Sequence, residues 1–383
     1  MDKIMLHFLA FILVSLTSSS EVSVENILSQ HNICTEPFKK KFSGEVLAFL
    51  TPWNSKGYDY ALKYSAKIDY ISPCWYQLNV YTVYGYKLEY DLLGEGNKTF
   101  IEASKDLFKI LPRIILENTN TDDYKKLLES DEDQVNLSEK IKNFIISKGF
   151  AGVMLEMWTQ GNGILRNADQ KEYLRSFQVR LIQKICRTMK ANNLMCMITV
   201  PAPRPNYRVE FSMGEFLKLS KFVDRFALVS YDYSQISPGP NSPENWIKSC
   251  YKELVDQIDL SDYDEEAAES MHLKYMKQLM LGVPFYGYEF SPLDKPNQYT
   301  RHSTRAITGN DFLQLLEKNK MRVEWESAHN EHKFSYKIGK NEIIAYFPTK
   351  EMIESRVKLA EKLKTGISIW ELGQGFEYFF EAL

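Results

Sequence analysis

The sequence predicts an α/β protein, a (β/α)8 TIM barrel that carries a small α+β insertion between its seventh and eighth strands. From about residue 44 onward, short apolar runs alternate eight times with longer amphipathic stretches. Several of the short runs are apolar throughout, as expected when both faces of a parallel strand are covered. A doubly wound open sheet is the structural alternative, but the glycine-rich phosphate loop that often marks its nucleotide-binding versions is absent from the sequence.

The eight apolar runs define the expected barrel strands. They are Glu45–Leu50, Ile68–Pro73, Arg113–Glu117, Gly152–Glu156, Met195–Val200, Arg225–Ser230, Leu279–Val283 and Ile367–Trp370. The clearest helix between them is expected over Lys171–Met189, where apolar residues recur at spacings of three and four and form one stripe.

The interval between the last two strands is longer than a helix with its loops requires. It contains a helical pattern at Asp311–Lys318, followed by three short stretches with strand character. The residues Gly339-Lys340-Asn341 between the last two of these stretches are typical of a hairpin turn. We therefore expect an α+β insertion at residues 291–348, beside the face of the barrel where sites are built.

The first 20 residues have the features of a signal peptide. Lys3 precedes a mostly apolar run over residues 4–16, and small residues follow at 17–20. This run is shorter than the roughly 20 residues of a membrane span, so an N-terminal anchor is the less favoured alternative. We expect a mature chain with no membrane span that is secreted or delivered to lysosomes.

Between the signal peptide and the barrel, residues 21–43 are polar and lack a convincing periodic element. We expect them to form an N-terminal extension to a barrel that occupies residues 44–383. The triplets beginning at Asn97 and Asn136 fit N-glycan acceptors, and both lie in polar stretches interpreted as loops.

Composition argues against several classes of function. The net charge of −3 and the lack of a long basic run give no indication of a nucleic-acid partner. The five cysteines are scattered and include no Cys-x-x-Cys pair, so neither a metal site nor a disulfide framework is expected. Most of the cysteines should be buried apolar thiols. No cofactor is implied.

Glu156 is the first candidate for a functional side chain. Alternation along a strand places Gly152, Met154, Glu156 and Trp158 on one face, with Glu156 near the carboxyl end of the fourth strand. A carboxylate at that position either serves a polar site or is held by a neighbouring Arg or Lys.

The segment Ala151–Trp158 resembles the signature strand of the family 18 glycoside hydrolases, the chitinases, whose pattern is Asp-x-x-Asp-x-Asp-x-Glu. In this sequence the four acids fall on Ala151, Met154, Glu156 and Trp158. The resemblance implies a substrate-assisted hydrolysis in which the last glutamic acid protonates the leaving oxygen. Because Trp158 has no suitable proton to give, the resemblance implies a barrel that has lost its catalytic acid.

Three more strand ends resemble the same family. Ser230–Tyr233 is similar to the Tyr-Asp motif that closes the sixth strand, and Leu281–Gly287 to the Gly-x-Pro-x-Tyr-Gly pattern of the seventh. Ile369–Gly373 is similar to the final strand, whose Trp forms the floor of the sugar site.

Aromatic and acidic side chains at these strand ends form the predicted carbohydrate-binding site. Indole and phenol rings offer flat faces to a pyranose, and carboxylates accept hydrogen bonds from its hydroxyl or amide groups. The predicted residues are Trp53, Trp75, Tyr76, Glu156, Trp158, Tyr231, Asp232, Tyr286 and Trp370. Any single aromatic among them could instead belong to the core.

Three functions remain open. The leading one is a non-catalytic lectin for amino-sugar oligosaccharides such as chitooligosaccharides; the resemblance adds lipopolysaccharide as a further ligand and a scavenger receptor as a partner. The second is an active glycosidase that uses Glu156 as its acid, with Asp232 or Glu371 nearby. The third is a protein-interaction scaffold whose cleft is filled by Trp158 and other side chains.

Overall fold

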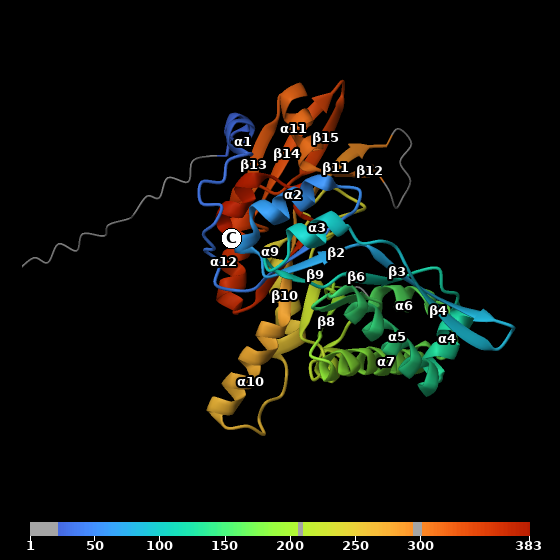
Figure 1. The fold of residues 1–383 in the computed structure, drawn as a ribbon. Coiled ribbons are helices and arrows are strands. Elements are labelled where there is room, and N and C mark those ends of the chain that lie inside the picture. The colour runs from blue at the N-terminus through green and yellow to red at the C-terminus, as the bar shows by residue number, and fades with distance from the viewer. Residues whose placement is uncertain (1–21, 206–209, 294–300) are drawn as a thin grey trace, which may run out of the picture.

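The structure, a computed structural model, describes residues 22–205, 210–293 and 301–383. It contains a barrel sheet surrounded by helices and a second, smaller sheet at one end (Figure 1). The strands of the barrel sheet are β1 (Val46–Leu50), β2 (Tyr70–Pro73), β3 (Tyr76–Val83), β4 (Lys87–Leu93), β5 (Lys109–Ile110), β6 (Arg113–Leu116), β7 (Gly152–Glu156), β8 (Met195–Pro201), β9 (Arg225–Val229), β10 (Leu279–Pro284) and β16 (Gly366–Trp370).

The pairing of these strands runs around the barrel. Parallel ladders join β6, β7, β8, β9, β10, β16, β1 and β2 in that order. The strand β2 continues into β3 after Cys74 and Trp75, while β5 continues into β6 after Leu111 and Pro112. Because β2 pairs with β5 and β3 pairs with β6, these two interrupted strands close the ring. The predicted (β/α)8 class and all eight predicted strands are confirmed.

Alternation along each strand separates an inner core from an outer one. On β1, Leu47 and Phe49 belong to the cluster inside the barrel, whereas Val46, Ala48 and Leu50 pack under the surrounding helices. Met residues of β7, β8 and β10 fill much of the interior. The apolar runs in the sequence arise from this double burial.

Helices cover the outside of the barrel. They are α2 (Ser55–Lys63), α3 (Lys98–Ala103), α4 (Thr121–Glu129), α5 (Asp131–Lys148), α6 (Trp158–Ile164), α7 (Lys171–Ala191), α8 (Met213–Leu219), α9 (Glu244–Tyr251), α10 (Glu265–Gln278) and α12 (Lys350–Leu363). The predicted helix over Lys171–Met189 is confirmed as α7.

The segment between β10 and α12 forms a five-stranded antiparallel sheet and the helix α11. Its elements are β11 (Gly287–Pro292), β12 (His302–Ile307), α11 (Gly309–Lys318), β13 (Arg322–Glu326), β14 (Glu331–Ile338) and β15 (Asn341–Tyr346). The first strand begins at Gly287, before the expected boundary at 291, because only Phe285 and Tyr286 separate it from β10. Gly339 has a φ of +61°, as the predicted hairpin turn requires.

One local element was not expected, and one local expectation is wrong. The extension at residues 21–43 contains the helix α1 (Val24–Gln30), which the Ser23 side chain caps through the backbone N–H of Asn26. Asn136 lies on the exposed side of α5 rather than in a loop, because the apolar residues around it supply a buried helical face. Asn97 does lie in a loop, at the N-cap of α3. The expected signal peptide at 1–20 falls outside the described residues.

Cysteine use agrees with the prediction only in part, because two of the five cysteines are buried free thiols. Cys74 and Cys250 are buried and free, and Cys34 is free and half-buried. Cys186 of α7 and Cys196 of β8 form a disulfide that the sequence did not predict. Within the described ranges, no helix is long and apolar enough to cross a membrane. No group of three or more His, Cys, Asp or Glu side chains suited to a metal ion occurs in these same ranges.

Candidate functional site

A cavity of about 230 Å³ lies at the carboxyl ends of the barrel strands. Sites of (β/α)8 barrels are built at this face because the loops that follow the strands meet there. The side chains from the strand ends and following loops are Phe49, Glu156, Thr199, Tyr231, Asp232, Tyr286, Ser368 and Trp370; residues 227–229 of β9 complete the lining. Five of the nine predicted site residues therefore meet in one cavity.

Asp232 is the acceptor on one wall of the cavity. Its Oδ1 accepts hydrogen bonds from the hydroxyls of Tyr286 and Tyr288, the latter at 2.7 Å. Its φ of +63° lies in the left-handed region, which Asp tolerates better than most residues. Arg204 donates to its backbone carbonyl at 2.5 Å. The carboxylate is thus fixed through Oδ1.

The phenols around Asp232 stay neutral over the physiological range. Burial, followed by the charge of Asp232, raises the pKa of Tyr286 and of Tyr231 well above the usual value. The same two causes raise the pKa of Tyr288 to about 12. The hydroxyls of these tyrosines can therefore donate hydrogen bonds, but they do not act as bases.

Glu156 is held by an ion pair. Its Oε2 accepts a hydrogen bond from Nη1 of Arg113 at 2.8 Å, and its Oε1 accepts one from Nε2 of Gln160 at 3.0 Å. The side chains of Arg113 and Glu156 are 13% and 22% exposed. The alternative that a neighbouring Arg holds this acid is confirmed, although the residue still lines the cavity.

Trp370 contributes an indole ring to the lining of the cavity. Its ring lies 5.2 Å from that of Phe49, centroid to centroid, and it is only half-buried. An indole in this position can stack against the C–H face of a sugar ring.

Glu371, the next residue, points away from the cavity. Its oxygens accept hydrogen bonds from Thr51 and from Nδ2 of Asn54, both in the loop after β1. Burial raises its pKa to about 7, against the opposing effect of these hydrogen bonds. The carboxyl is fully buried and is not part of the lining.

The predicted position of Trp158 is wrong. The strand β7 ends at Glu156, and Met157, with φ −124° and ψ −21°, turns the chain into α6. The indole is 1% exposed and packs edge-on against Phe211 in the outer core. Its Nε1–H donates to the carbonyl of Glu210 at 2.8 Å. Trp158 therefore neither lines the cavity nor fills it.

Trp75, Tyr76 and Trp53 also lie outside the cavity lining. Trp75 and Tyr76 belong to the outer core, because the second strand resumes at Tyr76 and continues to Val83 instead of ending at the barrel mouth. The indole of Trp75 donates to the hydroxyl of Tyr58 at 2.8 Å. Trp53 is 73% exposed in the loop after β1.

Sequence reasoning missed Tyr288, Phe49 and Ser368. A usable signal existed for each. Tyr288 lies two residues after Tyr286, Phe49 shares the inner face of β1 with Leu47, and Ser368 shares a face with Trp370. Alternation along β1 and β16 identifies Phe49 and Ser368 once the inner face is known, whereas the signal for Tyr288 is its place just after the motif that contains Tyr286.

Together, the barrel and the cavity at its carboxyl end define a (β/α)8 protein with a candidate site where the strands end. Residues 99–375 match the model of the glycosyl hydrolases family 18, and the chain therefore belongs to this family. Membership supports a carbohydrate-related function.

Solved structures show the same fold. A chitinase from Chromobacterium violaceum has 16% sequence identity and a TM-score of 0.66, over 89% of this chain and 98% of that one. The group IV chitinase of Ostrinia furnacalis has 15% identity and a TM-score of 0.62, again over 89% and 98%. The spore cortex-lytic enzyme of Bacillus megaterium has 14% identity and a TM-score of 0.67, over 88% and 72%. At these identities the likeness concerns the fold alone.

Proposed function

We propose that this protein is a non-catalytic, chitinase-like lectin that binds amino-sugar oligosaccharides. The observation that carries the proposal is the state of the two carboxylates in the cavity. Both oxygens of Glu156 accept hydrogen bonds from Arg113 and Gln160, and Oδ1 of Asp232 accepts from two tyrosine hydroxyls. An acid catalyst must present a free carboxyl oxygen to the glycosidic oxygen, and both oxygens of Glu156 are already engaged by Arg113 and Gln160.

The loss of the family acid supports the same conclusion. The position of the catalytic glutamate in the family pattern is occupied by Trp158, whose indole is buried among α6, α7 and the segment around Phe211. No simple rotation brings it to the cavity, because its Nε1–H is bonded and its ring is packed.

The size of the cavity points to the end of a sugar chain as the ligand. Its volume of about 230 Å³ is smaller than the roughly 300–1,000 Å³ of sites for drug-sized ligands. We propose that one amino-sugar ring stacks on Trp370, with Asp232 accepting hydrogen bonds from its hydroxyl or amide groups.

Titration of the purified protein with chitotetraose tests the proposal. Tryptophan fluorescence reports binding, and the same samples are assayed for shorter sugars. We expect saturable quenching with intact tetramer. Lack of binding to chitotetraose would contradict the proposed ligand class, and release of shorter products would contradict the non-catalytic role.

An active glycosidase is the second candidate, because Glu156 does line the cavity. A matched comparison of the wild type with Glu156→Gln decides between them. An enzyme loses turnover in this variant, whereas in a lectin neither protein releases product. The interaction scaffold is the third candidate; it predicts no glycan binding at all.

We infer further that the chain is a relative of chitinase domain-containing protein 1, also called stabilin-1-interacting chitinase-like protein. The support is the resemblance of Tyr231–Ser234 with Pro238–Asn241, of Ser368–Gly375, and of Glu156-Met157-Trp158 to its sequence. Ala151 departs from it. Lipopolysaccharide binding and a scavenger-receptor partner follow from that resemblance as proposals. Secretion or lysosomal delivery, and glycans at Asn97 and Asn136, are proposed from the signal-peptide features and the acceptor triplets.

A further inference from the structure

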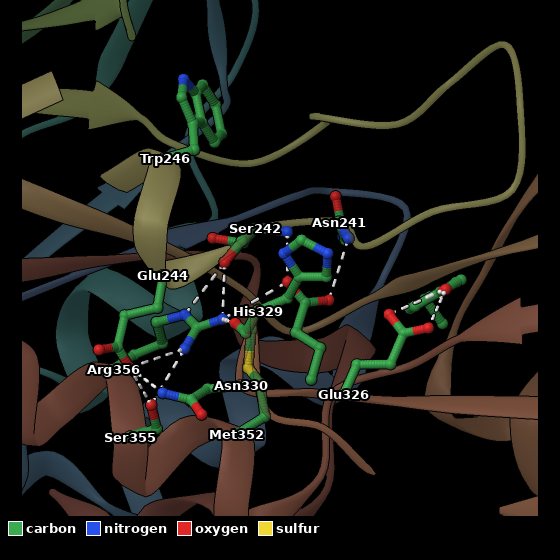
Figure 2. Close-up of polar contacts among 12 residues, drawn as sticks. Asn241, Ser242, Glu244, Trp246, Glu326, His329, Asn330, Met352, Ser355 and Arg356 are labelled. Carbon is green, nitrogen blue, oxygen red and sulfur yellow. Dashed lines mark hydrogen bonds and ion pairs between the residues drawn. The ribbon is translucent and has the colours of Figure 1, made fainter. Parts of the chain in front are cut away.

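A buried polar cluster lies behind the wall of the cavity that carries Asp232. Its centre is Arg356 of α12, which is 0% exposed. The guanidinium donates to the carbonyl of Ser242 at 2.7 Å and to that of His329 at 3.0 Å, and it contacts Oε1 of Glu331 at 3.4 Å (Figure 2). Its Nη1 donates to Oγ of Ser355 at 3.1 Å. We call this group the Arg356 cluster.

Glu331 connects the insertion to the loop after β9. It is the first residue of β14, and its carboxylate accepts two consecutive backbone N–H groups, from Asn241 at 3.0 Å and from Ser242 at 2.7 Å. Two donors from adjacent residues fix both the position and the orientation of the loop. The charge of Arg356 compensates the buried carboxylate, so the pair must be kept together.

Asn241 carries the connection from this loop to the cavity. Its Oδ1 accepts the backbone N–H of Asp232 at 2.8 Å, and its Nδ2 donates to the carbonyl of Tyr286 at 3.1 Å. Its own carbonyl accepts the N–H of Tyr233 at 2.9 Å. One buried side chain thus holds both Asp232 and the tyrosine whose hydroxyl donates to it.

The hydrogen bond from Asp232 to Asn241 matters because the backbone of Asp232 is in an unfavourable conformation. A φ of +63° costs a residue other than glycine on the order of 1 kcal/mol or more, so surrounding contacts must maintain it. If Asn241 releases the N–H of Asp232, the residue can relax toward negative φ, which turns its carboxylate away from the two tyrosines.

We propose that Glu331 and Asn241 are positioning residues of the sugar site, through which the insertion sets the direction of the Asp232 carboxylate. The proposal rests on the proposed sugar-binding function of that carboxylate. Neither residue lines the cavity. Their effect on a ligand is therefore exerted through Asp232.

The primary variant is Asn241→Ala, because it removes the connection and leaves both charges of the buried pair in place. Glu331→Gln is the second variant and keeps the shape of the side chain. Ser355→Ala is the matched control: it disturbs the Arg356 cluster through Glu244 and Arg356 but contacts neither residue 241 nor residue 242.

Each variant is titrated with chitotetraose under tryptophan fluorescence, and its urea unfolding is recorded. We expect Asn241→Ala and Glu331→Gln to raise Kd about tenfold, the equivalent of 1.4 kcal/mol, while Ser355→Ala stays within twofold. Unchanged binding by Asn241→Ala would overturn the proposal. So would an equal loss in Ser355→Ala, which would indicate general loosening.

A second measurement needs no sugar and separates this proposal from the proposed function. Tyr288→Phe removes one hydrogen bond to Asp232, and its effect on unfolding is measured in the wild-type and the Asn241→Ala backgrounds. If Asn241 holds the carboxylate in place, the loss in the Asn241→Ala background is clearly smaller, because coupled residues are not additive. Equal losses refute positioning, whereas wild-type protein that fails to bind chitotetraose refutes only the proposed ligand.

Discussion

The predicted aromatic residues line the cavity on one side of the barrel mouth and are buried in the outer core on the other side. On the side of β9, β10 and β16, the predicted residues Tyr231, Tyr286 and Trp370 line the cavity. On the side of β2 and β7, the predicted residues Trp75 and Trp158 are in the outer core. Both sets follow an apolar strand in the sequence, so composition alone does not separate them.

The difference lies in what the chain does after each strand. Alternation assigns a side chain to a face only as long as the strand continues. After β7 the chain enters a helix at Trp158, and after β2 it resumes as β3 and extends into a hairpin. After β9, the positive φ of Asp232 instead keeps its side chain at the mouth. After β10, the link to β11 is so short that the side chain of Tyr286 also stays there.

The largest expected effect is on stability, at Trp158. Trp158→Ala should lower the free energy of unfolding by about 3–5 kcal/mol, because it leaves a large cavity in a packed core. Sugar affinity of the folded protein should stay the same. Urea unfolding measures the first quantity and chitotetraose titration the second. Trp158→Phe keeps most of the packing and should lose much less stability. A variant that kept its stability but lost sugar affinity would show that Trp158 belongs to the site.

Glu371 provides a pH-dependent test on the opposite side of the mouth. Its pKa is about 7 in the folded protein and 4.5 in the reference state, so between these values the folded state holds a proton that the unfolded chain has released. The contribution of Glu371 to stability therefore falls as pH rises through this window, by about 3 kcal/mol at 1.36 kcal/mol per unit. Glu371→Gln, compared by urea unfolding from pH 4.5 to 8, should remove this slope. An unchanged slope would assign it to other groups.

Trp370→Ala should weaken chitotetraose binding by about 2 kcal/mol, roughly 30-fold, because a buried aromatic anchor often dominates a small interface. Fluorescence quenching must then be replaced by calorimetry, since the reporter is removed. Tyr76→Phe, in the outer core on the other side, is the matched control and should leave Kd unchanged. Equal losses of chitotetraose affinity in both variants would mean that the two sides of the mouth contribute equally to sugar binding.

The barrel strands could be predicted because double burial produces apolar runs that are visible in the sequence. The insertion could be predicted because the interval before the last strand is longer than a helix with its loops requires. The pair of β3 and β4 was missed, although residues 76–93 alternate around Gly85 as a hairpin does. In the site, short motifs located Asp232 and Trp370. The ion pair of Arg113 with Glu156 and the link from Glu331 join residues more than 40 positions apart, so only tertiary structure reveals them.

Trp53→Ala tests how far the site extends beyond the cavity and should have the smallest effect. The indole is 73% exposed and is not part of the lining, so its removal should change the free energy of unfolding by less than about 0.5 kcal/mol. If one terminal sugar fills the cavity, the affinity for chitobiose should also stay the same. The affinity for chitotetraose is the informative quantity. A loss seen only with the longer sugar would place Trp53 under its outer rings and extend the site across the loop after β1, whereas equal affinities confine recognition to the wall formed by Asp232, Tyr286 and Trp370.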